Sequence, residues 1–141
     1  VIVLSQHAIP HLEKTKGAIV NVSSIASYPF AKSEAYYPMS KAALDQLTVQ
    51  MAGTLIKKGI RVNAVKLVLT RDAPIFTESR VQIIEKYETL IAAKSAVPLG
   101  KPGEPEDIAK IIVFLADRSQ SEIIIGQKIT ADGGAVLRNV L

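Results

Sequence analysis

Residues 17–24 read Gly-Ala-Ile-Val-Asn-Val-Ser-Ser, a short and almost wholly apolar run that ends in two hydroxyl side chains. The run follows a Lys-Thr-Lys-Gly helix stop and is typical of a strand buried on both faces of a parallel sheet. Ser23 and Ser24 then lie at the carboxyl edge of that sheet, where α/β folds bind their ligands. The stretch therefore predicts an α/β protein with a candidate site at one sheet edge.

The segments that follow this strand continue the alternation of helix and strand. Apolar residues at helical spacing predict a helix over 36–57, and the apolar run 60–65 predicts a second strand. Pro and acidic residues predict that a further helix begins near Glu104, and a last strand is expected within 123–130. The order β-α-β-(α)-α-β is typical of a sheet with parallel strands.

Composition excludes several classes of protein. The 141 residues fit one domain, and a hydrophobic share of 48% supports a substantial core. The net charge of +4 is scattered along a chain with few aromatics, which argues against nucleic-acid binding. The lack of cysteine excludes a thiolate metal site and favours the cytoplasm, and no stretch approaches the roughly 20 apolar residues of a membrane span. His7 and His11 are interpreted as surface histidines, so no metal site is expected.

Tyr37 and Lys41 are four residues apart in the predicted long helix, so they project from the same face one turn apart. An ammonium beside a phenol stabilises the phenolate, which lets the pair exchange a proton with an alcohol or carbonyl oxygen near neutral pH. Chance often produces this spacing, so by itself it favours a structural role. Ser24 alone likewise favours a capping or turn serine.

The ordered combination of these residues is far more specific. The strand ending at Ser24, a Tyr thirteen residues later, a Lys four after that and Arg-Val-Asn-Ala-Val at 61–65 occur in order. Pro-Leu-Gly-Lys-Pro-Gly-Glu-Pro-Glu-Asp at 98–107 and Asp-Gly-Gly at 132–134 follow. The pattern resembles the classical short-chain dehydrogenase/reductase family over nearly the whole chain. The resemblance implies the C-terminal half of a Rossmann-type doubly wound parallel sheet.

That resemblance also implies an oxidoreductase that transfers hydride between NAD or NADP and a secondary alcohol or ketone. Tyr37 matches the general acid/base, Lys41 the group that stabilises its phenolate and binds the nicotinamide ribose, and Ser24 the residue that orients the substrate oxygen. Thr70 is expected to contact the nicotinamide carboxamide, and residues 71–99 are expected to form a lid over a small alcohol or carbonyl substrate. A homo-oligomer is implied as well.

Two departures from the family pattern set limits on this prediction. The Gly-rich phosphate loop of the family lies upstream of Val1, so residues 1–141 are expected to form a single partial domain that is inactive alone. Lys66-Leu67-Val68 stands where the family has a Pro-Gly pair, and valine is expected to fail where the backbone must pass close to a cofactor or take a positive φ. A non-catalytic truncated relative that acts as an oligomerisation partner is therefore the alternative. Asn63 and Asp132 are expected to secure strand ends and turns.

Overall fold

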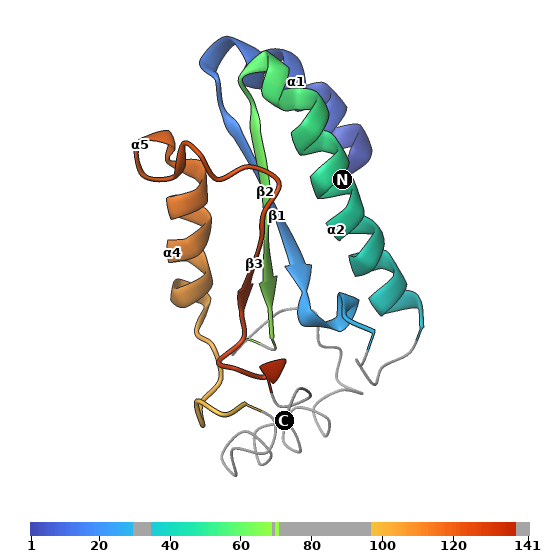
Figure 1. Ribbon diagram of the computed structural model, residues 1–141, viewed down its shortest axis with the longest axis vertical. Coiled ribbons are helices and arrows are strands. Elements are labelled where there is room, and N and C mark those ends of the chain that lie inside the picture. The colour runs from blue at the N-terminus through green and yellow to red at the C-terminus, as the bar shows by residue number, and fades with distance from the viewer. Residues whose placement is uncertain (30–34, 69, 71–96, 138–141) are drawn as a thin grey trace.

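The protein is described by a computed structural model over residues 1–29, 35–68, 70 and 97–137. These residues form a three-stranded parallel sheet with strand order β1-β2-β3, flanked by helices (Figure 1). This confirms the α/β fold. In chain order the elements are α1 (Ile2–Thr15), β1 (Ala18–Ser24), the 3-10 turn η1 (Ile25–Ser27), α2 (Tyr36–Leu55), the 3-10 turn η2 (Ile56–Lys58), β2 (Arg61–Leu67), α4 (Pro105–Ala116), α5 (Arg118–Ser121) and β3 (Lys128–Ala131).

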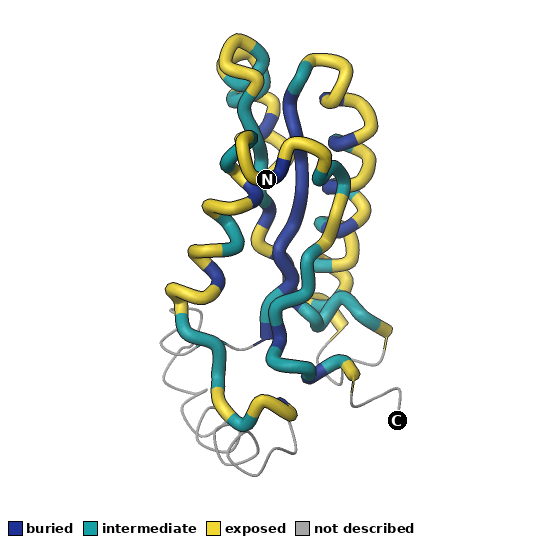
Figure 2. The backbone as a smooth tube through the Cα atoms, turned by 60° about the vertical axis from the view of Figure 1, so that its left-hand side comes forward, coloured by how far each residue is buried: buried dark blue, intermediate teal, exposed yellow. Residues whose placement is uncertain are grey.

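Helices cover both faces of the sheet. Figure 1 shows α1 and α2 on one side of the strands and α4 on the other. The central strand β2 is buried along nearly all of its length, as the dark tube in Figure 2 shows. Because the three strands are parallel, their carboxyl ends meet at one edge of the sheet, and α2 begins at that same end. This edge carries the residues that the sequence marks for function.

The strand register aligns one row of polar residues at that edge. Ser23 of β1 pairs with Lys66 of β2, and Lys66 pairs in turn with Thr130 of β3. Partners in neighbouring parallel strands project to the same face of a sheet. Ser23 and Lys66 both contact α2, so the row faces that helix. The second strand was expected to end at residue 65, and its two additional residues bring Lys66 into this row.

The buried face of α2 differs from the apolar stripe that the sequence suggested. Its buried residues are Asp45, Thr48, Ala52 and Leu55. Of the expected stripe of Met39, Ala43, Leu47, Met51 and Leu55, only Leu55 is buried, and Met39 is 65% exposed. Asp45 and Thr48 both hydrogen-bond to residues of β1, which turns polar side chains inward. A helix with apolar residues at regular spacing can therefore bury a partly polar face.

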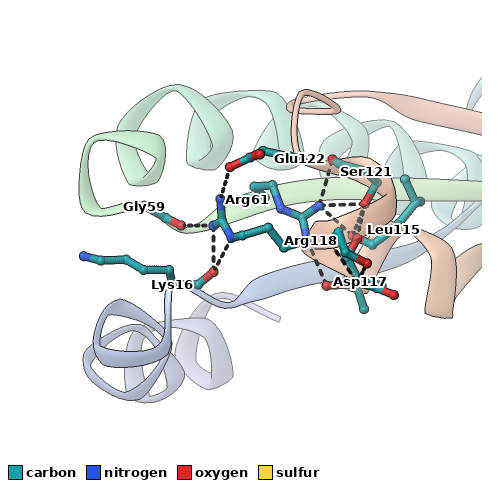
Figure 3. Close-up of polar contacts among 10 residues, drawn as sticks. Lys16, Gly59, Arg61, Leu115, Asp117, Arg118, Ser121 and Glu122 are labelled. Carbon is teal, nitrogen blue, oxygen red and sulfur yellow. Dashed lines mark hydrogen bonds and ion pairs between the residues drawn. The ribbon is translucent and has the colours of Figure 1, made fainter.

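The amino-terminal end of β2 holds a buried arginine that caps a helix. Arg61 is 1% exposed, and its guanidinium donates to the backbone oxygens of Leu115 and Ala116 at 2.8 and 2.9 Å (Figure 3). It also donates to Ser121 Oγ at 3.0 Å. The two backbone oxygens lie at the C-terminal end of α4, where a cation also offsets the helix dipole. Burial and the nearby charge of Arg118 lower the pKa of the Arg61 guanidinium.

A second arginine ties α5 to the loops that precede two strands. Arg118 donates to the backbone oxygens of Lys16 and Gly59 at 2.7 and 2.6 Å (Figure 3). Both acceptors belong to left-handed residues that end a helical segment, with φ values of 52° and 80°. Arg61 and Arg118 therefore join the helices α4 and α5 to the end of the sheet that lies opposite the candidate site.

Candidate active site

Ser24 is the last residue of β1 and begins the turn η1. Its Oγ accepts a hydrogen bond from the Ala26 amide at 3.1 Å, and its backbone oxygen accepts one from Ser27 Oγ at 2.8 Å. The accepted N–H occupies one lone pair of the hydroxyl and leaves its proton to donate elsewhere. The turn-capping role and the role of a donor to a substrate oxygen are therefore compatible at Ser24.

Tyr37 and Lys41 lie in the first turns of α2. The Lys41 ammonium is 5.7 Å from the centroid of the Tyr37 ring, and it donates to the backbone oxygen of Val22 at 2.9 Å. Val22 is two residues before Ser24, so Lys41 fixes the start of α2 against the end of β1. Tyr37 is 42% exposed and accessible to a ligand, whereas its neighbour Tyr36 is 85% exposed.

A buried carboxylate that the sequence did not single out lies beside these residues. Asp45 accepts hydrogen bonds from Ser23 at 2.5 Å and from Ser27 at 2.7 Å, and forms a 2.8 Å ion pair with Lys66. Burial by itself raises the pKa of the Asp45 carboxyl, but the hydrogen bonds from Lys66, Ser23 and Ser27 outweigh it and hold that pKa below its ordinary value. Asp45 is therefore held as a carboxylate.

Lys66 completes this cluster from β2. Its side chain is 4% exposed, and its Nζ lies 3.4 Å from the centroid of the Tyr28 ring. The Tyr28 hydroxyl is 3.0 Å from Thr130 Oγ1 on β3. A cation against an aromatic face and beside a carboxylate recovers part of the hydration lost on burial. Sequence reasoning identified Lys66 only as a departure from the family pattern, because burial of a lysine leaves no signal in hydropathy.

The structure answers one part of the expectation for position 68, because the backbone there does not take the positive φ that would require glycine. Lys16 is the only non-glycine residue with a positive φ in the described part of the chain, so the backbone at Val68 is not left-handed. Val68 instead packs its side chain into an apolar cluster with Val97 and Ala135, against which Ile25 also packs. The departure therefore fills space behind the turn that carries Ser24, without backbone strain.

Asn63 and Asp132 have the structural roles that were expected, and Thr70 pairs with Gly103. Asn63 donates to the Ile124 backbone oxygen at 2.7 Å and accepts from the Gln127 amide at 2.9 Å, which secures the entry to β3. Asp132 accepts from two backbone amides of the turn that follows β3. Thr70 forms a parallel β-bridge with Gly103. If position 103 carried a side chain, its Cβ would lie 3.4 Å from the Thr70 methyl group.

Two expectations concern other parts of the chain. Nearly all of the predicted lid, 71–99, lies outside the described residues, including the part near 78–94 where a helix is expected. His7 and His11 are both exposed on α1. None of the helices in the described ranges combines the length and the apolar character that a membrane span requires.

Comparison with known proteins identifies the family. A family profile described as enoyl-(acyl carrier protein) reductase matches residues 1–136. The chain belongs to the short-chain dehydrogenase/reductase family. It is 36% identical over 135 residues to the 3-oxoacyl-[acyl-carrier-protein] reductase FabG of Thermotoga maritima, covering 95% of this chain and 52% of that protein.

Solved structures of the family agree in fold. The crystal structure of a Caenorhabditis elegans short-chain dehydrogenase/reductase with cofactor is similar at a TM-score of 0.86 and 43% identity, over 96% of this chain and 51% of that one. 4-Hydroxyisoleucine dehydrogenase complexed with NADH gives a TM-score of 0.75 at 31% identity, over 96% and 54%. The three strands described above thus have the Rossmann-type arrangement, and the chain spans about half the length of the relatives it matches.

Proposed function

We propose that the protein containing this chain is an NAD- or NADP-dependent oxidoreductase that interconverts a secondary alcohol and a ketone. One observation carries the proposal: Lys41 binds the backbone of β1 two residues before Ser24, which puts the start of the Tyr37 helix against the strand that ends at Ser24. Family membership and a cofactor in each of the two similar solved structures support it.

The roles of the three residues follow from their chemistry. In the reducing direction, the Ser24 hydroxyl donates a hydrogen bond to the substrate carbonyl oxygen and holds it in place. Tyr37 donates its phenolic proton to that oxygen as the C–O double bond becomes a single bond. Lys41 stabilises the phenolate that remains, and solvent returns the proton to Tyr37. The nicotinamide, when bound, supplies the hydride to the substrate carbon, and oxidation reverses every step.

The residues present suit one end of the cofactor. Lys41 offers an ammonium suited to ribose hydroxyls, and Thr70 offers a hydroxyl suited to the nicotinamide amide. We propose that the pyrophosphate is bound by a preceding half of the domain, in keeping with the partial coverage of the relatives. On this proposal the chain alone binds the cofactor weakly and is inactive.

Calorimetric titration with NADH and NADPH tests cofactor binding. The chain and the complete translation product of its gene are compared, and we expect tight binding only by the latter. Absence of binding by both would leave the non-catalytic alternative, an oligomerisation partner, in its place.

Two neighbouring tyrosines provide a matched test of catalysis in the complete product. With a panel of ketones and secondary alcohols, Tyr37→Phe should lower kcat by about 100- to 10,000-fold, the usual contribution of a general acid or base. Tyr36→Phe removes the same hydroxyl one residue away and should leave kcat unchanged. Equal effects of the two substitutions would contradict the assigned role of Tyr37.

A homo-oligomer is part of the same proposal. Met39 and Val49 on α2, and Val3 and Leu4 on α1, expose between 37% and 75% of their surface, which suits burial against another surface. Light scattering of the complete product tests this, and a monomer would contradict it. A cytoplasmic location stays a prediction, which fractionation of the source cells tests.

A further inference from the structure

Lys66 is a buried lysine near Ser24 with no role in the chemistry proposed above. Its side chain is 4% exposed, and its ammonium contacts the Asp45 carboxylate and the Tyr28 ring. Burial of an ammonium is unfavourable unless a partner compensates for the lost hydration. The two contacts compensate for this burial and fix the position of the Lys66 ammonium beside Asp45.

The carboxylate that Lys66 contacts, Asp45, accepts hydrogen bonds from residues on both sides of Ser24. Asp45 Oδ1 accepts from Ser23, the residue before Ser24, and Asp45 Oδ2 accepts from Ser27, three residues after it. The same Ser27 hydroxyl lies 2.8 Å from the Ser24 backbone oxygen, so its one proton is shared between the two acceptors. One carboxylate thus anchors the end of β1 and the turn η1 to α2.

The charge of Lys66 matters to this arrangement because of how a carboxyl group hydrogen-bonds. An ionised carboxylate only accepts hydrogen bonds, so it can accept one from each serine hydroxyl and one from the Lys66 ammonium. A protonated carboxyl becomes a donor at one oxygen and competes with the hydroxyls it previously accepted. Without a neighbouring cation, burial favours this protonated form.

We propose that Lys66 is a positioning residue, whose buried ammonium fixes the Asp45 carboxylate and thereby the turn that presents the Ser24 hydroxyl. The inference rests on the proposed function, because the placement of Ser24 affects catalysis only if Ser24 binds the substrate oxygen. Lys66 itself touches neither substrate nor cofactor in this scheme.

A double-mutant cycle between Lys66→Gln and Ser24→Ala tests the inference. Steady-state kinetics use the complete translation product, the preferred nicotinamide cofactor and the most active ketone of the panel. Lys66→Gln should lower kcat by about 10- to 100-fold, the order expected from a small misplacement of a catalytic group. In the Ser24→Ala background the same substitution should have almost no further effect, because the group that it positions is gone.

Two readouts separate positioning from a loss of stability. In Lys66→Gln the acid limb of the kcat–pH profile should move to higher pH, since Asp45 then loses its cationic partner. The matched control Lys58→Gln removes an ammonium that pairs with Glu13 at the surface, and should leave kcat within about twofold. Fully additive effects in the cycle, or an unchanged kcat in Lys66→Gln, would overturn the inference.

Ser27→Ala provides a second route if Lys66→Gln does not purify as a folded protein. It removes the contacts of the turn with Asp45 and with the Ser24 backbone oxygen but leaves the Lys66–Asp45 ion pair in place. It should lower kcat and be non-additive with Ser24→Ala, and additivity would overturn the inference.

Hydrogen exchange distinguishes failure of this inference from failure of the proposed function. The Ala26 amide, which donates to Ser24 Oγ, should exchange at least about 10-fold faster in Lys66→Gln, while the Gly126 amide, bonded to Val62, should not change. An active wild type with an impaired Ser24→Ala variant and unaltered Ala26 exchange in Lys66→Gln would sink only the positioning role. Full activity in Ser24→Ala would sink both.

Discussion

The central strand β2 carries a buried cation near each end, and the two are satisfied in different ways. Arg61 donates mostly to neutral backbone oxygens at the end of α4, whereas Lys66 pairs with the Asp45 carboxylate beside the candidate site. A planar guanidinium can satisfy several carbonyls at once, which suits a helix end. A compact ammonium beside a carboxylate instead sets a local charge. The first arrangement joins elements, and the second controls hydrogen bonding at the site.

The largest effect is expected where a charge is left unpaired. Asp45→Ala leaves the Lys66 ammonium buried without its carboxylate and removes the acceptor of Ser23 and Ser27. The free energy of unfolding should fall by about 3–5 kcal/mol, the usual result of breaking a buried ion pair. Urea denaturation measures it, and a loss below about 1 kcal/mol would mean that the ammonium finds solvent easily.

Removal of the arginine should have a smaller effect on stability. Arg61→Met removes the guanidinium donors of the Leu115 and Ala116 backbone oxygens, and should cost about 2–3 kcal/mol in urea denaturation. The folded fraction of the complete product should keep its kcat within about twofold, because this end of the sheet is remote from Ser24. A loss of kcat without a loss of stability would erase the distinction between the two cations.

The pH dependence of stability should also differ between variants at the two ends of β2. The pKa of Asp45 is lowered by folding, so its stabilising contribution is complete above the ordinary value of 3.8 and is lost as pH falls through the lower folded value. Asp45→Ala should therefore weaken the loss of stability on acidification, whereas Arg61→Met should weaken it less, because Arg61 is only a minor cause of the lowered pKa of Asp117. Some acid dependence should remain in both, because hydrogen bonds from Ser119 and Gln120 also lower the pKa of Asp117. Urea denaturation repeated between about pH 2.5 and 6 measures this difference, and identical slopes in the two variants would contradict it.

The smallest effect is expected from an exposed lysine. Lys58 pairs with Glu13 at 3.0 Å, but the two side chains are 45% and 43% exposed. Lys58→Met should change the free energy of unfolding by no more than about 0.5 kcal/mol, because water screens such pairs. A cost comparable to that of Asp45→Ala would show that burial does not separate the two lysines.

The sequence predicted the order of the elements and the edge of the sheet that matters. The apolar run that ends at Ser24 required a strand there, and helical spacing required the helix that carries Tyr37 and Lys41. The structure confirms both elements and brings their ends together through the bond from Lys41 to Val22. Periodicity and family resemblance succeed here because they depend on local pattern and residue order.

The sequence by itself determined an α/β domain of the short-chain dehydrogenase/reductase family with Ser24, Tyr37 and Lys41 as candidates. Only the tertiary structure decided that Asp45, Lys66 and Arg61 are buried, that α2 packs a partly polar face inward, and that the backbone accepts Val68 without strain. Hydropathy places charged residues at the surface, since burial of a charge is favourable only where a partner lies in reach. That partner comes from another element, far along the chain, and folding alone brings the two together.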